Sequence, residues 1–140
     1  MLARHARLIL ADVYATWERG DLDTTLSYCT SHIAYAVHAS RDAPSFVGSG
    51  VGRDALAFQL ERFARQFAVE EFRLQLLRTE GILFVSTVAF RYRHRATRLD
   101  VDGQMRHKWL FIGDEIAGFE LFHDARRMRA FYDLAQAGVA

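Results

Sequence analysis

The stretch from Ile82 to Ile112 constrains the fold of this chain most strongly, because its apolar and polar residues alternate with a period of two. Side chains of a β-strand point to opposite faces in turn, so residues 82–95 predict one long strand. Its first half is apolar on both faces, whereas its second half carries aromatic residues and a histidine on one face and arginines on the other. Residues 105–112 and 115–123 alternate in the same way. These three strands predict a bent or twisted antiparallel meander.

The dipeptide Asp102-Gly103 lies between the first two of these strands. It is a strong signal for a two-residue hairpin, because both central positions of a type I′ turn need a positive φ. We therefore expect the chain to reverse direction there. In the strand that follows, Met105, His107 and Trp109 share one face. This aromatic, histidine-bearing face is expected to line a pocket.

The other segments predict helices that cover the sheet. Helix 2–19 should pack through a seam of Leu2, Ala6, Ile9, Val13 and Trp17, and should stop at Gly20. We expect helices at 22–29, capped by Asp21, and at 54–67 and 125–136. Strands are expected at 31–39 and 69–79, and a loop at 41–52. Helices segregated to one side of an antiparallel sheet make an α+β domain, so residues 1–140 are expected to form a single domain of this class.

Composition excludes several functional classes. The net charge of +1 gives no reason to expect a nucleic-acid or membrane partner. Cys29 is the single cysteine, so an internal disulfide is excluded and a reduced compartment is the simplest expectation. The N-terminal residues lack an apolar run typical of a signal peptide, which favours a cytoplasmic protein. His94, His107 and His123 share a face, but no H-x-H or H-x-x-x-H spacing occurs, and we expect neither a metal nor another cofactor.

Three short motifs resemble the NTF2-like superfamily in their order and spacing. Trp17-Glu-Arg-Gly-Asp-Leu-Asp23 resembles its corner between the first two helices, and Gly52-Arg-Asp-Ala-Leu56 resembles the start of its third helix. Gly113-Asp-Glu-Ile116 with Phe119-Glu-Leu-Phe-His-Asp124 resembles its last hairpin and strand. The superfamily includes ketosteroid isomerase, SnoaL-like polyketide cyclases, limonene epoxide hydrolase, scytalone dehydratase and non-catalytic binding proteins. The resemblance implies a conical α+β barrel with a deep pocket, often dimeric, but no single reaction.

Most catalytic positions of these relatives are not matched. Val37 stands where ketosteroid isomerase has its general base, Val13 (next to Tyr14) where it has its oxyanion tyrosine, and His107 where it has its protonated aspartate. The inner face shows no Asp-Arg-Asp set of an epoxide hydrolase. Tyr35 does resemble the first-strand tyrosine of scytalone dehydratase and the epoxide hydrolases, and Trp17-Glu18 stands where the dehydratase has a Tyr-Asp pair.

The SnoaL-like cyclases rely on an acid near the end of the last strand, for which Glu120 and Asp124 are the candidates here. By alternation, Glu120 should point away from the pocket. We therefore take the catalytic candidates from the remaining polar residues of the inner face and the first helix: His107 as acid, base or enolate donor, Tyr35 and Tyr14 as oxygen donors, and His123. Each of them could instead be a core residue satisfied by the backbone or by water. The expected substrate-binding residues are Trp17, Val37, Val88, Phe90, Tyr92, Trp109, Phe119 and Leu121.

The outer face of the meander carries a basic stripe formed by Arg91, Arg93, Arg95, Arg106 and Lys108. It could bind an acidic partner, but a solvated face or a homodimer interface pairing with Glu70, Glu71 and Glu120 is favoured. Three functions therefore remain open. The leading hypothesis is a cofactor-independent enzyme for proton transfer (isomerisation, aldol-type cyclisation or dehydration) on a small hydrophobic carbonyl compound. The others are a non-catalytic binder of a hydrophobic ligand and a dimeric interaction module.

Overall fold

The computed structural model describes residues 2–38 and 48–139. Its helices and strands confirm the expected α+β class, and most segments have the secondary structure predicted for them. In chain order they are α1 (Ala3–Glu18), α2 (Leu22–Ser27), β1 (Cys29–His38), β2 (Gly48–Val51), α3 (Arg53–Gln66), β3 (Phe67–Glu80), β4 (Leu83–His94), β5 (Asp100–Ile112), β6 (Glu115–Phe122) and α4 (Ala125–Val139).

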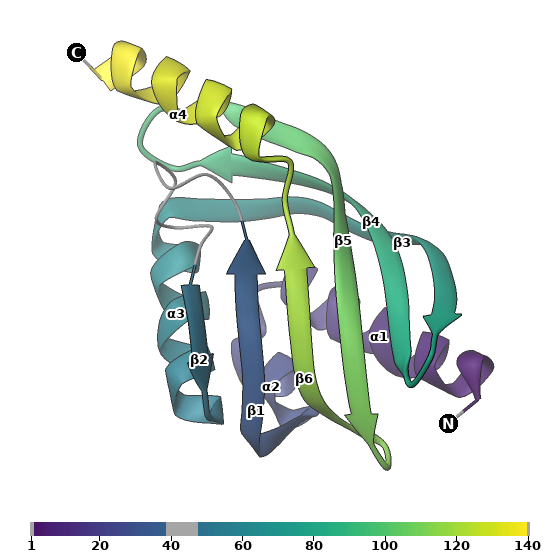
Figure 1. Cartoon of the computed structure of the whole chain (residues 1–140). Coiled ribbons are helices and arrows are strands. Elements are labelled where there is room, and N and C mark those ends of the chain that lie inside the picture. Colours follow the sequence, from purple (N-terminus) through teal and green to yellow (C-terminus); the bar gives the residue numbers. More distant parts are fainter. Residues whose placement is uncertain (1, 39–47, 140) are drawn as a thin grey trace.

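The six strands form one curved sheet in the order β2-β1-β6-β5-β4-β3 (Figure 1). The expectation of a purely antiparallel sheet is wrong, because β1 runs parallel to β6 while the other neighbours are antiparallel. Alternation identifies the strands but contains no information about the direction of a partner distant in sequence. The sheet is also not closed: β2 and β3 remain its two edges. The expected conical barrel is therefore an open, curved sheet.

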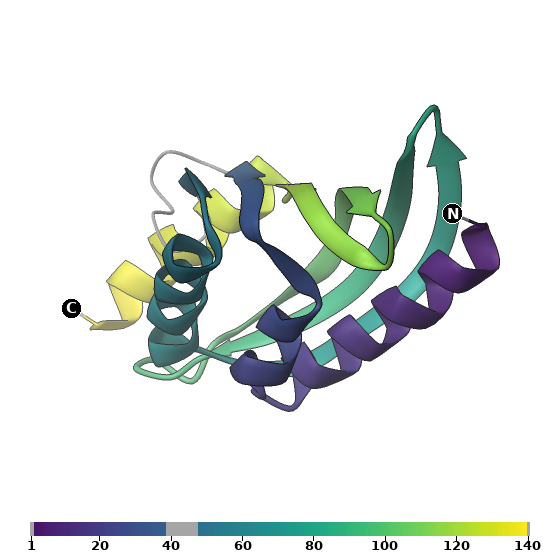
Figure 2. The ribbon, with the colours of Figure 1, turned by 90° about the horizontal axis from the view of Figure 1, so that it is seen from below.

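Helices α1, α2 and α3 lie on the concave side of this sheet (Figure 2). The long strands β3 and β4 can curve around them because their pairing is interrupted by register shifts at Val69/Glu71 and Leu74/Leu76. At the first shift, the carboxylate of Glu18 in α1 accepts a hydrogen bond from the backbone N–H of Phe72, at 3.0 Å. This hydrogen bond beside the register shift holds α1 against β3.

The first helix buries Ala6, Leu10, Val13 and Tyr14 toward the sheet. This confirms part of the expected seam, but Leu2 is 71% exposed and precedes the helix. The buried stripe is therefore rotated toward Tyr14, since residues three and four apart share a helix face.

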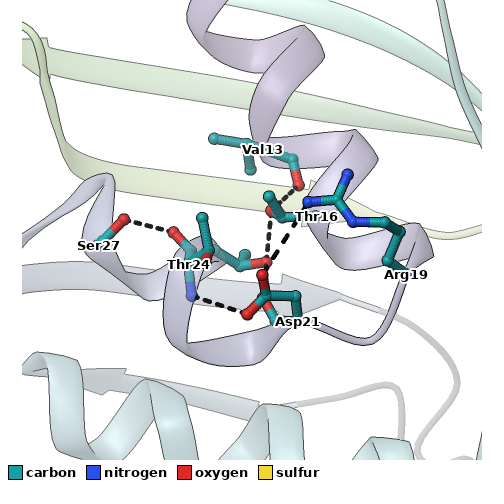
Figure 3. A network of polar contacts seen from close by, with 7 residues as sticks. Val13, Thr16, Arg19, Asp21, Thr24 and Ser27 are labelled. Atoms are coloured by element: carbon teal, nitrogen blue, oxygen red, sulfur yellow. Dashed lines mark hydrogen bonds and ion pairs between the residues drawn. The ribbon is translucent and has the colours of Figure 1, made fainter.

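The corner between α1 and α2 is held by short-range polar contacts (Figure 3). Gly20 ends α1 with φ of 75°, a left-handed conformation that favours glycine. The Asp21 carboxylate then accepts a hydrogen bond from the backbone N–H of Thr24 at 3.2 Å and caps α2, as expected. Thr16 donates to the Val13 carbonyl oxygen at 2.8 Å and also contacts the hydroxyl of Thr25. The predicted stop and cap are both confirmed.

The predicted hairpin at Asp102-Gly103 is wrong. Both residues lie inside β5, opposite Arg91 and Phe90 of β4, and the chain reverses at residues 95–99 instead. That turn is anchored on the end of α3, where the Arg95 backbone N–H donates to the Gln66 carbonyl oxygen at 2.8 Å. Tertiary contacts override the local preference of the dipeptide.

Gly103 serves a different purpose within β5. Its φ of 155° is rare for residues with a side chain, and an added Cβ would lie 3.1 Å from the side chain of Arg127. Arg127 of α4 donates to the backbone oxygen of Asp102 and also pairs with its carboxylate. The glycine therefore lets α4 approach the strand closely, where Met128 and Phe131 are buried.

The predicted loop 41–52 is also partly wrong. Residues 48–51 form β2, which pairs with β1 in antiparallel register. The preceding part of that prediction, 41–47, lies outside the described residues. Alternation is weak in the sequence Gly-Ser-Gly-Val, so the pattern did not identify this edge strand.

Two of the five residues of the basic stripe on the outer face, Arg93 and Lys108, pair with acids. Arg93 lies 3.7 Å from Glu70 and 3.0 Å from Asp100, and Lys108 lies 3.4 Å from Glu80. Glu120 points outward, as expected, and contacts His38 at 3.1 Å. These exposed pairs are typical of a solvated sheet face and add little stability each. The homodimer expected through this face stays a prediction.

Candidate active site

A buried polar cluster joins α1 to the centre of the sheet. The hydroxyl oxygen of Tyr14 lies 2.7 Å from Oγ of Ser86 and 3.0 Å from Nδ1 of His107. The indole N–H of Trp109 donates to Oγ of Ser86 at 3.0 Å. Ser86 on β4 and His107 on β5 are direct cross-strand neighbours, so alternation places both side chains on the inner face. All of these residues are buried.

Burial keeps this cluster uncharged. Loss of water contact raises the pKa of the Tyr14 phenol, although hydrogen bonds from Ser86 and Trp109 partly oppose this shift. Burial lowers the pKa of His107 to about 3, and repulsion by the nearby His123 acts in the same direction. At neutral pH the phenol is therefore protonated and the imidazole is neutral. Such groups can offer hydrogen bonds to a ligand, but His107 is a weak base there.

The cluster borders a cavity of about 100 Å³ between the sheet and the helices α1, α2 and α3. Aromatic and aliphatic side chains make up nearly all of its wall, and its few polar side chains are those of Tyr14, Thr25, Gln59, Tyr92 and His107. The wall consists of Val13, Tyr14, Trp17, Thr25, Leu26, Cys29, Val37, Leu56, Gln59, Leu60, Phe72, Tyr92, His107, Trp109, Ile116, Phe119 and Leu121. An apolar cavity with few polar groups is typical of a small-molecule site.

Most of the predicted site residues meet at this cavity. Tyr14 and His107 border it, together with six of the predicted substrate-binding residues: Trp17, Val37, Tyr92, Trp109, Phe119 and Leu121. Val88 and Phe90 are buried in the core and are not part of this wall. They lie on the same face as the wall residues, and alternation cannot tell which residues of that face border the cavity.

Tyr35 lies outside the wall of this cavity. It is buried on β1, stacks on Phe119 with ring centroids 6.0 Å apart, and does not belong to the cavity wall. A Cβ added to Gly50 of β2 would lie 2.7 Å from the Tyr35 hydroxyl oxygen. The phenol therefore extends across the neighbouring edge strand, where glycine leaves room for it. The structure thus does not bring Tyr35 and His107 together.

His123 follows β6 and borders a smaller cavity of about 50 Å³. The walls of the two cavities share six residues: Trp17, Val37, Gln59, Leu60, Tyr92 and Leu121. Burial lowers the pKa of His123 to about 3, and its ring meets the edge of Phe90 with centroids 5.7 Å apart. His123 is therefore a second neutral histidine on the inner face, beyond the cluster of Tyr14.

Sequence reasoning missed Ser86 and Gln59. Ser86 is a small polar residue between Phe84 and Val88 in the inner row of β4, and that exception in the apolar half of the strand could have drawn attention to it. Gln59 is a polar residue of α3, and an amphipathic pattern indicates the buried face of a helix by its apolar residues alone. A Cβ on Gly48 would lie within 2.4 to 2.8 Å of the Gln59 amide, so β2 packs closely over this side chain.

Carboxylates are absent from the described wall of the cavity. Glu120 faces outward, and Asp124 accepts hydrogen bonds from the backbone N–H groups of Arg126 and Arg127 as a cap of α4. Across residues 2–38 and 48–139, no group of three His, Cys, Asp or Glu side chains is placed to hold a metal ion. Within the same ranges, no helix has the length and apolar character needed to cross a membrane.

Neither a family model nor a curated protein matches this sequence. Solved structures do match its fold. An NTF2-like protein from Burkholderia xenovorans is 15% identical over 93% of this chain and 97% of its own, with a TM-score of 0.75. A candidate polyketide cyclase from Xanthomonas campestris is 14% identical over 91% and 96%, with a TM-score of 0.74. A candidate isomerase from Rhodopseudomonas palustris is 12% identical over 92% and 96%, with a TM-score of 0.76. The chain therefore has the NTF2-like fold, which SnoaL-like and ketosteroid isomerase-like proteins share.

Proposed function

We propose that this protein binds a small, mainly apolar molecule that carries a carbonyl group. The supporting observation is the apolar cavity with the neutral His107 in its wall. A carbonyl oxygen needs a hydrogen-bond donor when it leaves water, and an uncharged donor can be buried without the cost of burying a charge. The aromatic side chains of Trp17, Phe72 and Trp109 supply the contact area for the apolar part.

The experiment compares ligand binding in two tryptophan variants. Leu121 lies between Val37 and His107 on neighbouring strands and belongs to the cavity wall, so Leu121→Trp should fill the cavity. Leu110→Trp places the same side chain on the outer face of β5 and serves as the matched control. Cyclopentanone and cyclohexanone, titrated by NMR, should bind the wild type and the control but bind Leu121→Trp at least tenfold more weakly. Equal binding by both variants contradicts the proposal.

A second candidate is proton-transfer catalysis on the bound carbonyl compound: isomerisation, aldol-type cyclisation or dehydration. The direct contact of Tyr14 with His107 at the cavity wall favours it, since neutral donors there can stabilise a developing enolate oxygen. Proton abstraction also needs a base, and neither a carboxylate nor a histidine of ordinary pKa borders the described cavity. For this reason ligand binding is our first proposal.

Enolisation can be tested without knowing the natural substrate. The ketone is incubated with the protein in D₂O, and exchange of its α-hydrogens for deuterium is followed by NMR. Catalysis requires exchange faster than in buffer alone, together with loss of the acceleration in His107→Ala and its retention in Thr16→Val. Exchange at the buffer rate in the presence of saturating protein supports binding without catalysis.

A further inference from the structure

The direction of the hydrogen bonds in the buried cluster follows from the chemistry of its members. An indole N–H can only donate, so Oγ of Ser86 accepts from Trp109. Ser86 is 0% exposed, and its hydroxyl hydrogen needs an acceptor of its own. Among the described residues, Tyr14 is the one other side chain that hydrogen-bonds to Ser86. Ser86 therefore donates to the Tyr14 oxygen.

The next hydrogen bond of the cluster joins Tyr14 to His107. The Tyr14 oxygen accepts from Ser86, and its own hydrogen then points to Nδ1 of His107 at 3.0 Å. The opposite direction would leave the Ser86 hydrogen buried without an acceptor, which disfavours it by roughly fivefold or more. Nδ1 must therefore present a lone pair, and a neutral imidazole with a bare Nδ1 carries its hydrogen on Nε2. No described residue hydrogen-bonds to Nε2, and His107 borders the cavity.

We propose that Tyr14 is a positioning residue that holds His107 as the Nε2–H tautomer, and that the cavity therefore selects ligands with a bare hydrogen-bond acceptor. In this arrangement Tyr14 does not itself donate to the ligand, because its single hydrogen is committed to His107. Ser86 and Trp109 support the direction of these hydrogen bonds. The assignment of the tautomer stands independently, whereas the ligand selectivity rests on the function proposed above.

Nitrogen-15 NMR of the imidazole tests the positioning role directly. In the wild type at pH 7.5, we expect His107 to show a protonated Nε2 and a bare Nδ1. Tyr14→Phe removes the donor to Nδ1, so the Nδ1–H tautomer should become populated. Ser86→Ala is the matched control: the buried Tyr14 hydrogen then has Nδ1 as its one hydrogen-bond acceptor among the described side chains, so the Nε2–H tautomer should be kept. Thr16→Val removes a buried hydroxyl elsewhere and should also leave the tautomer unchanged.

Two results would overturn the assignment of Tyr14. One is a wild-type His107 that is protonated on Nδ1. The other is a Tyr14→Phe variant that folds and retains the wild-type ratio of tautomers. If Tyr14→Phe does not fold, the measurement on the wild type still decides, because the direction of these hydrogen bonds predicts which nitrogen of His107 is protonated.

The selectivity is tested with three single-ring probes of similar size, because benzene enters an engineered apolar cavity of roughly 150 Å³, a volume of the same order as the about 100 Å³ here. Pyridine at pH 7.5 is an acceptor, pyrrole is a donor and benzene is neither. The wild type should bind pyridine about fivefold or more tightly than pyrrole, and His107→Phe should lose this preference. Equal or tighter binding of pyrrole by the wild type overturns the selectivity. Failure of all three probes to bind contradicts the proposed function itself, while the tautomer measurement is unaffected.

Discussion

Lowering the pH should destabilise this protein well before its carboxylates titrate, because two histidines are buried in neutral form. Burial lowers the pKa of His107 and of His123 to about 3. In the unfolded chain each imidazole returns to its ordinary pKa of about 6.5. Between these values the unfolded state binds more protons than the folded state, so stability falls as pH falls. The effect should begin near pH 6.5 and continue toward pH 3.

The magnitude follows from the difference in proton binding. From pH 7.5 to pH 5, each imidazole that protonates only on unfolding costs about 2 kcal/mol, and the two together cost about 4 kcal/mol. His94 acts in the same direction, since partial burial lowers its pKa as well. The acids Asp21, Glu80 and Asp100 have pKa values below their ordinary range and therefore contribute at lower pH.

Urea unfolding followed by circular dichroism at pH 7.5 and pH 5 measures this loss. In His107→Phe and in His123→Phe, the difference in the free energy of unfolding between pH 7.5 and pH 5 should shrink by about 2 kcal/mol. This holds whatever the stability of each variant at pH 7.5. Thr16→Val carries no change in titratable groups and should show the wild-type difference. A wild type equally stable at both pH values, or histidine variants with an undiminished difference, would refute the reasoning.

Three further predictions concern stability in urea at neutral pH. Asp21→Ala should cost about 1 kcal/mol, because the N–H of Thr24 loses its cap; a change below a few tenths contradicts this role. Ser86→Ala should cost about 1–3 kcal/mol by leaving the indole N–H of Trp109 without its acceptor; a neutral result would show that this hydrogen bond adds nothing. Gly103→Ala should cost at least about 1 kcal/mol through its φ of 155° and its approach to Arg127; an unchanged midpoint of unfolding would contradict both contributions.

Local chemistry predicted the elements of this fold well. Gly20 and Asp21 define the end of α1 and the start of α2 through contacts within one turn of the chain. Alternation identified β4 and β6 and placed His107 and Trp109 on the inner face, because the period of a strand depends on the backbone alone. These features need no knowledge of what packs against them.

The errors arose where a distant segment decides. Asp102-Gly103 has the composition of a hairpin, but the contact of Arg95 with the end of α3 moves the turn and Arg127 approaches the glycine instead. The parallel pairing of β1 with β6 likewise depends on segments from opposite ends of the chain. Tyr35 was predicted on the correct face, but Gly50 on a neighbouring strand determines where its phenol lies.

The sequence by itself determined which faces of the helices and strands are buried, and hence that aromatic residues and histidines share the inside of the sheet. Tertiary structure alone decided that Tyr14 meets Ser86 and His107, which are 72 and 93 residues away along the chain. The physical reason is that periodicity fixes the direction of a side chain relative to its own backbone. Hydrogen bonds between elements depend instead on the curvature of the sheet and on the rotation of α1 against it.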